Sequence, residues 1–407
     1  MEKLRISELK QFYHNELLEN VIPFWEKSDL IDREYGGFIT SVDRAGKSYN
    51  SDKSVWFQGR CLWTFAKLCN TYGERPEWAA AADSGAAFLK KYCIDSSDGR
   101  MYFTVTRDGK PLRKRRYYFS ESFLVVGFAE YYLLRHKKED LELAERYFDL
   151  MYRIYRDADA DPFKITPKEN AAVRNLHSNA NPMVLVSAAQ TLRRADSDRQ
   201  EYYDSIIGSI IDDMINLHYK EDLHCVLETV YANGDILDNP AGRTINPGHS
   251  IENSWFLMNY ANLTKDASLL EKALNILRWS LELGWDKEYG GIYYFRDVYG
   301  RPCEQLEHDM KLWWVHDEAL IATLLAYNLT GDAYYAEWYE RVHKYVFSHF
   351  PDREYGEWYG YLHRDGTVSH TQKGSLWKGP YHLPRAMMLC EQILTAAEKC
   401  EIVGPLL

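Results

Sequence analysis

The sequence YGGFITSVDRAGK at residues 35–47 is closely matched by YGGIYYFRDVYGR at 289–301 and by YGEWYGYLHRDGT at 355–367. Two weaker copies begin at Asp98 and Leu223. The shared pattern is a glycine-bearing or acidic turn, a short run of aromatic or β-branched residues, and a second turn before another short run. Glycine tolerates the positive φ that tight hairpin turns require, so the pattern predicts short β-hairpins.

The copies recur at a regular interval, and helical patterns lie between them. Gly36 and Gly99 are separated by 63 residues, and Tyr289 and Tyr355 by 66. Between the copies, apolar residues recur at i, i+3, i+4 and i+7, which is typical of amphipathic helices. Helices are predicted at residues 54–72, 78–92, 119–135, 141–156, 182–195, 202–219, 251–263, 268–283, 318–329, 334–350 and 383–397.

A helix, a hairpin loop and a second helix in each repeat predict about six helix pairs over the chain. The simplest closed arrangement is an all-α (α/α)6 barrel, a toroid of inner and outer helices with short β-hairpins in the connecting loops. It would form one domain over residues 1–407. An open helical solenoid is the alternative, but neither end has the polar capping repeat that a solenoid needs. In a barrel the starts of the inner helices meet at one rim, where a pocket is expected.

The composition excludes several classes of function. With 46% hydrophobic and 27% charged residues, the chain can bury a large core, which excludes disorder. Lys and Arg number 49 against 60 Asp and Glu, without a sustained basic run, so nucleic acid and anionic membranes are poor partners. No apolar stretch approaches the roughly 18 residues of a membrane span. The N-terminus lacks the apolar core of a signal peptide, and seven scattered cysteines fit a reducing cytoplasm.

Aromatic residues make up 14% of the chain, and many stand beside Gly, Asp or His instead of in apolar runs. Core packing explains most of them, and a carbohydrate pocket would explain the rest, because flat rings cover the apolar faces of a pyranose. In KLWWVHDEA, residues 311–319, Trp313 and Trp314 precede His316 and two acids. The segment suits a sugar platform. A core tryptophan pair with Asp317 as a helix cap is the alternative.

A second candidate segment is NPGHSIENSW at residues 246–255. His249 and Glu252 are three residues apart on one helix face, so Glu252 could orient His249 and support its charged form. The alternative is helix capping, with Ser250 as the cap and Glu252 in the first turn.

Two further segments carry candidate polar groups. KGSLWKGPYHLPR at residues 373–385 has two glycines and two prolines before the last helix, so a rigid loop points His382 in a definite direction. A neutral histidine bonded to backbone is the alternative. Arg60 lies among aromatic residues on a predicted helix face, where it could bind an oxyanion or form a buried ion pair.

Taken together, Arg60 and the segments 242–252, 311–318 and 378–385 resemble the N-acylglucosamine 2-epimerase family, and the resemblance spans nearly the whole chain. The family also includes cellobiose 2-epimerases and aldose–ketose isomerases acting on mannose or sulfoquinovose, and its fold is the (α/α)6 barrel. The resemblance implies proton transfer at C2 of a small-molecule sugar through an enediolate, without a cofactor. It also implies a homodimer, with ATP as an effector that is not consumed. Residues 242–248 lack the Lys-Ser/Thr of a phosphate-binding loop, so the residues themselves predict no nucleotide site.

The resemblance assigns roles to individual residues. His249 and His382 would face each other across the pocket as base and acid. Arg60 would hold the developing oxyanion, Glu252 would orient His249, and Glu318 would bind substrate hydroxyls or help to open the ring. The resemblance further implies substrate contacts from Trp313, Trp314, His316, Lys378, Asn181, His177 and Arg385.

One position helps to choose among the members of the family. The cellobiose and isomerase branches carry an additional His where this chain has Pro182 or Met183, as the acylglucosamine epimerases also do, although His177 could replace it from a loop. The preferred interpretation is interconversion of N-acetylglucosamine and N-acetylmannosamine. An aldose–ketose isomerase or a cellobiose or mannose 2-epimerase is the alternative within the family.

Functions from other classes stay open at this point. A glycoside hydrolase would use Glu252 and Glu318 as its two carboxylates. A metal-dependent isomerase would bind a divalent ion through His249, Glu252 and His382, although no metal-binding motif such as HExxH is present and no metal is predicted. A non-catalytic sugar-binding protein is the third alternative, and it would incorporate no solvent deuterium into the sugar.

Overall fold

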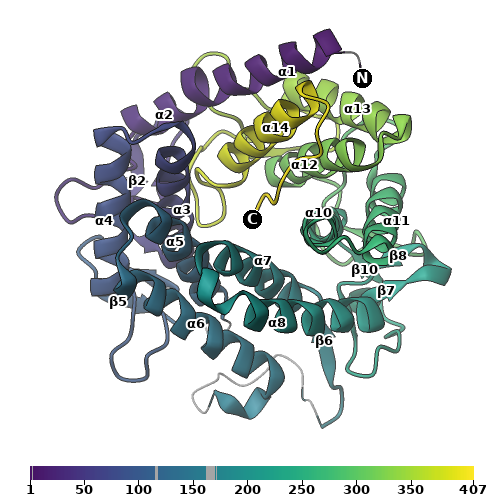
Figure 1. Cartoon of the computed structure of the whole chain (residues 1–407), viewed down its shortest axis with the longest axis horizontal. Helices are drawn as coiled ribbons and strands as arrows, with labels where there is room; N and C mark the ends of the chain where they lie inside the picture. Colours follow the sequence, from purple (N-terminus) through teal and green to yellow (C-terminus); the bar gives the residue numbers. More distant parts are fainter. Residues whose placement is uncertain (2, 115–117, 162–169, 171) are drawn as a thin grey trace.

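The computed structural model describes residues 1, 3–114, 118–161, 170 and 172–407, and its helices form two concentric rings (Figure 1). The inner ring consists of α3 (Val55–Tyr72), α5 (Phe119–Arg135), α7 (Ala180–Ala195), α10 (Pro247–Thr264), α12 (Trp313–Thr330) and α14 (His382–Glu398). The outer ring consists of α1 (Lys3–Asn15), α4 (Pro76–Tyr92), α6 (Lys138–Arg156), α8 (Gln200–Asp213), α11 (Ala267–Gly284) and α13 (Ala333–His349). Two shorter helices are α2 (Ile22–Lys27) and α9 (Pro240–Arg243). Successive inner helices pack together, and each also packs against one outer helix, which confirms the predicted (α/α)6 barrel.

Contacts between the two ends of the chain close the ring. Helix α1 packs against α14, and Ser7 Oγ donates a hydrogen bond to the Glu398 carboxylate at 2.7 Å. At the end of α3, Tyr72 donates to Glu391 of α14 at 2.5 Å, which joins the first inner helix to the last. The open solenoid is therefore excluded. None of the described helices is long and apolar enough to cross a bilayer.

The predicted helical segments are all helices, with small differences at their ends. Helix α12 begins at Trp313, five residues before the predicted start. Its first turns are buried on every side, so they lack the one-sided apolar pattern from which a surface helix is predicted. The segment predicted to end at residue 219 leaves the α-helix after Asp213 and continues as a π-helical turn, Met214–His218.

The turn pattern of the sequence corresponds to a loop that recurs in the structure. Copies of this loop contain Asp32, Asp95, Asp286 and Asp352, and in each the Asp N–H donates to the carbonyl five residues further on. An isolated β-bridge closes every one of these loops. The spacing of these four aspartates is 63 residues at the start of the chain and 66 at its end, so the predicted repeat interval is confirmed.

Short antiparallel strands follow the loops. They are β1 (Ser41–Val42) with β2 (Ser48–Asn50); β3 (Lys53–Ser54) with β4 (Thr104–Val105) and β5 (Pro111–Arg113); β6 (Leu176–Ser178) with β9 (Thr229–Tyr231); β7 (Tyr219–Lys220) with β8 (Cys225–Val226); β10 (Thr244–Ile245) with β11 (Arg296–Asp297); and β12 (Lys311–Leu312) with β13 (Tyr361–Leu362) and β14 (Val368–His370). The copies that begin at residues 35, 98 and 355 contain the predicted hairpins. In the copies at 223 and 289, β9 and β11 pair instead with the distant β6 and β10. Strands this short gain too little from a local hairpin to exclude such partners.

Ion pairs of the buried aspartates tie the loops at Asp32, Asp286 and Asp352 to another copy of the repeat. Asp32 accepts hydrogen bonds from Lys53 at 2.9 Å and from Arg107, in the next copy, at 2.9 Å. Burial disfavours the Asp32 carboxylate, but the two cations and backbone donors outweigh it and lower its pKa to about 2. Asp352 in the last copy binds Arg44 in the first at 2.7 Å. These ion pairs therefore also join the last copy of the repeat to the first, where the ring closes.

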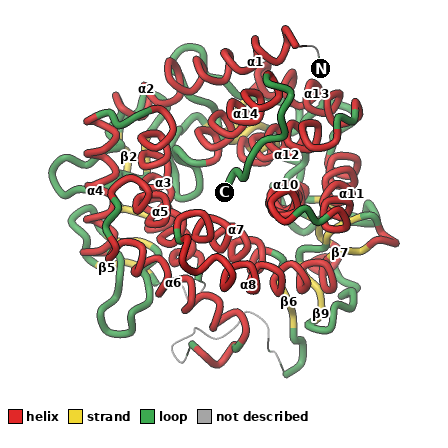
Figure 2. The backbone as a smooth tube through the Cα atoms, viewed as in Figure 1, coloured by secondary structure: helices red, strands yellow, loops and turns green. Residues whose placement is uncertain are grey.

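The two ends of the barrel differ. The first turns of the inner helices surround an open cavity at one end. At the other end, residues 401–407 run across the centre of the ring (Figure 2). Leu406 N–H donates to Asn259 near the end of α10 at 2.7 Å, and Asn262 donates to the Val403 carbonyl at 2.9 Å. The side chains of Val403 and Leu406 are buried, so the C-terminal segment covers the end opposite the cavity.

Candidate active site

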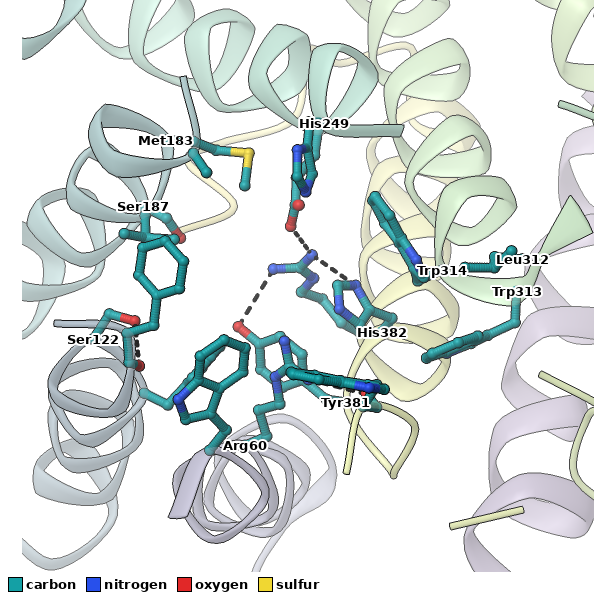
Figure 3. A pocket seen from close by; sticks show the side chains of 18 of the residues that line it. Arg60, Ser122, Met183, Ser187, His249, Leu312, Trp313, Trp314, Tyr381 and His382 are labelled. Atoms are coloured by element: carbon teal, nitrogen blue, oxygen red, sulfur yellow. Dashed lines mark hydrogen bonds and ion pairs between the residues drawn. The ribbon is translucent and has the colours of Figure 1, made fainter. Parts of the chain in front are cut away.

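A cavity of about 560 Å³ opens at the rim where the inner helices begin (Figure 3). It is lined by Trp56 and Arg60 of α3; Phe119, Ser122, Phe123 and Val126 of α5; Ala180, Met183, Val184 and Ser187 of α7; His249, Glu252 and Phe256 of α10; Trp313 and Trp314 of α12; and His382 and Arg385 of α14. Loops add Tyr294, Glu307, Met310, Leu312, Tyr361, His370, Trp377 and Tyr381. All six inner helices direct their N-terminal ends here, which favours negative charge in the cavity.

His249 stands in the first turn of α10. Asn246 caps this helix by accepting a hydrogen bond from the His249 N–H at 3.1 Å, and Pro247 begins the helix. The imidazole Nδ1 lies 3.0 Å from the carboxylate of Glu228. Burial alone would lower the pKa of His249, but the Glu228 charge and hydrogen bond prevail and raise it above its ordinary value. His249 is therefore disposed to carry a proton, and Nε2 is left for proton transfer.

His382 is the first residue of α14 and has the opposite electrostatic bias. Its Nδ1 donates to Glu318 at 2.7 Å, and a guanidinium nitrogen of Arg385 lies 3.4 Å from the same atom. Burial, followed by the charge of Arg385, holds the pKa of His382 well below its ordinary value. His382 is therefore a neutral base with Nε2 as its basic atom.

The two imidazoles belong to one cavity and flank one aromatic ring. The Trp314 ring centroid lies 5.4 Å from that of His249 and 5.8 Å from that of His382. Figure 3 shows both imidazoles projecting from different helices toward the same space. A protonated and a neutral imidazole that face one cavity can exchange protons on two faces of a carbon.

Arg385 forms a buried ion cluster behind His382. Its side chain is 2% exposed, and one terminal nitrogen donates to Glu252 at 2.5 Å and to Glu318 at 2.6 Å. The second Glu318 oxygen accepts from Trp255 Nε1 at 2.8 Å. Both oxygens of Glu318 thus hold other side chains of the protein.

The structure places the two carboxylates differently from their expected roles. Glu252 is not hydrogen-bonded to His249, because the guanidinium of Arg385 is its partner and Glu228 is the partner of His249, but after Glu228 the charge of Glu252 also helps to raise the pKa of His249. Glu318 does not reach substrate, because it is fully buried beneath His382 and does not line the cavity. Both carboxylates are held by α14, Glu252 by Arg385 and Glu318 by His382 and Arg385.

The same cluster argues against the metal and hydrolase alternatives. Ligand atoms of Glu252, Glu318 and His382 lie within 4.8 Å of one another. The Arg385 guanidinium is bonded to both carboxylates, so it already supplies the positive charge that a divalent ion would bring. A hydrolase would need both carboxylates to flank a glycosidic bond, and Glu318 is sealed from the cavity.

Arg60 lies at the cavity without an anionic partner among the described residues. Its guanidinium stacks on Phe123 at 4.1 Å from the ring centroid and donates to the Trp377 carbonyl at 3.1 Å. Burial lowers its pKa to about 10, so the side chain stays charged at neutral pH. The alternative of a structural ion pair is not observed, and this cation is available to a developing oxyanion.

Comparison with known proteins shows the family to which the chain belongs. The model of the N-acylglucosamine 2-epimerase (GlcNAc 2-epimerase) family matches residues 37–386. The chain belongs to the N-acylglucosamine 2-epimerase family. It is 36% identical over 387 residues to the N-acylglucosamine 2-epimerase of Mus musculus, covering 93% of this chain and 90% of that protein. The Bos taurus enzyme of the same name is 36% identical over 381 residues, with 93% and 89% covered.

Solved structures of other family members show the same fold. The cellobiose 2-epimerase from Bacillus thermoamylovorans superposes with a TM-score of 0.82 at 22% identity, and the match covers 94% of this chain and 98% of that one. At this identity the likeness concerns the fold alone.

Several predicted substrate contacts in this family member lie away from the cavity. His316 is fully buried, where Nδ1 donates to the Leu312 carbonyl at 2.7 Å and Nε2 accepts from the Ile292 N–H at 2.9 Å. Burial lowers its pKa to about 3, so it is a neutral structural histidine. Lys378 is buried in an ion pair with Glu357 at 2.5 Å. His316 holds the backbone of Ile292, and Lys378 holds the carboxylate of Glu357. Both side chains therefore stabilise neighbouring segments and do not line the cavity.

The two contacts predicted around α7 are also misplaced. His177 lies on β6, where its Nδ1 is 2.7 Å from Nε2 of His218, and it does not line the cavity. Asn181 stands in the first turn of α7, but the neighbouring Ala180 and Met183 line the cavity in its place. A shift of one residue on a helix turns a side chain by about 100°, so position near a helix start does not determine which residue faces inward.

Sequence reasoning missed Glu228 and the apolar residues from α5 and α7. Glu228 precedes His249 by 21 residues and follows β8 in a degenerate copy of the repeat. No motif marks it. Val126, Met183 and Ser187 belong to ordinary amphipathic helix patterns, and only the closure of the ring turns them toward a cavity instead of a solid core.

Proposed function

We propose that this protein is a sugar 2-epimerase that interconverts N-acetylglucosamine and N-acetylmannosamine. The observation that carries the proposal is the pair of imidazoles, one with a raised and one with a lowered pKa, lining one cavity together with Arg60, which has no anionic partner among the described residues. The names of the relatives at 36% identity support the choice of sugar.

The chemistry begins with the open-chain aldose bound between the two imidazoles. His382 Nε2 removes the proton from C2, and the electrons of the C–H bond form the C1–C2 double bond while negative charge moves to the C1 oxygen. Arg60 stabilises that oxyanion. The imidazolium of His249 then donates its Nε2 proton to the opposite face of C2. The carbonyl re-forms with C2 inverted, and the reverse reaction uses the same two groups in exchanged roles.

Glu228 is a positioning residue in this mechanism. Its carboxylate fixes the His249 ring through Nδ1 and favours the imidazolium form needed for proton donation. Glu318 plays a different part for His382, because its own charge is balanced by Arg385. Glu318 therefore orients the His382 ring, while burial and, after it, the charge of Arg385 hold the pKa of that ring low.

Proton NMR of sugars incubated with the enzyme in heavy water tests the proposal. N-acetylmannosamine should exchange its C2 proton for deuterium and appear as N-acetylglucosamine. Formation of a ketose would identify an aldose–ketose isomerase, and release of reducing sugar from an oligosaccharide would identify a hydrolase. A sugar-binding protein would leave every C2 proton in place, and that outcome would refute the proposed activity.

The proposed chemistry requires no bound cofactor, so turnover should survive exhaustive treatment with EDTA. A cytoplasmic location, a homodimer and ATP as an unconsumed effector are further parts of the proposal and rest on the family resemblance. Sedimentation of the purified chain tests the dimer. Epimerisation rates with and without ATP test the effector, and phosphate release should stay absent.

A further inference from the structure

The plane of the reaction intermediate limits where the substituent on C2 can point. When C2 is planar, one imidazole approaches from each face, so the substituent lies in the plane and points at neither His249 nor His382. Trp314 contacts both imidazoles and closes one in-plane direction. Figure 3 places Met183, Ser187 and Ser122 across the cavity from Trp314. C1 and C3 lie in the same plane, and the in-plane direction opposite Trp314 leads to the wall formed by α5 and α7.

That wall has a composition unlike a surface for sugar hydroxyls. Val126, Met183 and Val184 line it with apolar atoms, and Phe256 of the adjoining α10 extends it. Ser122 also lies there, but its hydroxyl donates to the Phe119 carbonyl at 2.8 Å. Ser187 Oγ makes no hydrogen bond to any residue that the structure describes. A hydroxyl group placed against this wall would lose its partners in water, whereas an alkyl group would not.

We propose that Val126, Met183, Val184, Ser187 and Phe256, the acyl wall, bind the N-acyl group of the substrate, with Ser187 Oγ donating to the acyl carbonyl. The inference rests on the proposed function and adds the residues that set acyl specificity. Val126 and Ser187 lie about one helical turn deeper than Phe123 and Met183 on their helices. These two residues therefore limit the length of the acyl chain.

The test compares N-acetyl-, N-propanoyl- and N-butanoylmannosamine by kcat/KM for C2 inversion. Val126→Phe fills the end of the acyl wall and should lower the rate with the propanoyl sugar about tenfold more than with the acetyl sugar. Val126→Ala enlarges the wall and should raise the butanoyl rate relative to the acetyl rate. Ser187→Ala should reduce kcat/KM for all three acyl sugars by about tenfold.

Leu312→Phe is the matched control, because Leu312 is buried and lines the same cavity on the Trp314 side (Figure 3). It should change the three acyl sugars by one common factor. Two outcomes would overturn the assignment of the acyl wall. In one, both Val126 variants change kcat/KM for the three acyl sugars by the same factor. In the other, Leu312→Phe changes kcat/KM by a factor that depends on the length of the acyl group. If circular dichroism shows that Val126→Phe does not fold, the test rests on Val126→Ala and its ratio of butanoyl to acetyl kcat/KM.

Failure of the proposed function has a different signature. In that case the wild-type protein exchanges the C2 proton of none of these sugars. The acyl wall is then tested by binding alone, through quenching of tryptophan fluorescence by the same three ligands. Val126→Phe should still weaken the propanoyl ligand more than the acetyl ligand, and an unchanged ratio of affinities would refute the wall.

Discussion

The carboxylate of Glu228 lies 3.0 Å from Nδ1 of His249 and gives this imidazole a negatively charged partner. Glu252 is nearer in sequence but binds Arg385. His382, in contrast, lies beside the guanidinium of Arg385. The two imidazoles of one cavity are thereby held in different charge states before a substrate binds.

Glu228→Gln should keep the hydrogen bond to His249 but remove the charge. The pKa of His249 then falls, since its negatively charged partner is lost. In the reaction direction in which His249 donates its proton, the alkaline limb of the kcat/KM profile should therefore move to lower pH. The acid limb, which reports protonation of His382, should stay in place. A profile with an unmoved alkaline limb would contradict this role.

Replacement of either imidazole should abolish epimerisation without unfolding the barrel. His249→Ala and His382→Ala should each lower the rate about 10²- to 10⁴-fold, the usual contribution of a general acid or base, with unchanged circular dichroism. Each variant keeps one base, so each should still exchange the C2 proton of one epimer in heavy water. The two variants should act on different epimers. Exchange of the same epimer by both would show that the imidazoles do not serve opposite faces.

Arg60→Ala should lower kcat far more than it raises KM, because the oxyanion exists only after C2 is deprotonated. Loss of such a charged donor typically costs about 10²- to 10³-fold in kcat. Arg296→Ala is a matched control, since its guanidinium also stacks on an aromatic ring, at 4.7 Å from the Tyr293 centroid, but does not line the cavity. Steady-state kinetics of Arg60→Ala and Arg296→Ala measure kcat and KM separately and test this expectation. A loss confined to KM would assign Arg60 to binding alone.

Glu318→Ala should destabilise the fold as well as the site. It removes one of the two carboxylates that neutralise the buried Arg385, and breaking a buried ion pair typically costs about 3–5 kcal/mol of unfolding free energy. Arg5→Ala breaks the exposed pair with Glu340 and should cost less than about 1 kcal/mol. Denaturant unfolding of both variants measures the difference. Equal stability of the two proteins would mean that the buried cluster contributes no more than a surface pair.

The architecture could be predicted because its signals are local. A glycine turn at residues 35–47 and an apolar period of 3.6 residues each act within one loop or one helix, so they can be recognised without knowing the rest of the fold. The repeat interval then indicates a ring. The predicted hairpins that do not form are those of β9 and β11. These strands pair with strands far away in the sequence, and no local pattern marks such pairing.

The sequence by itself also indicated part of the candidate site, because His249 and His382 stand in distinct motifs at predicted helix starts and Arg60 stands among aromatic residues on a predicted helix face. Tertiary structure decided which groups surround them. The closure of six helix pairs brought Glu228 to His249 and Arg385 between Glu252 and Glu318. A carboxylate binds whichever cation or imidazole the packing places within about 3 Å, and that distance depends on the whole ring, not on neighbours along the chain.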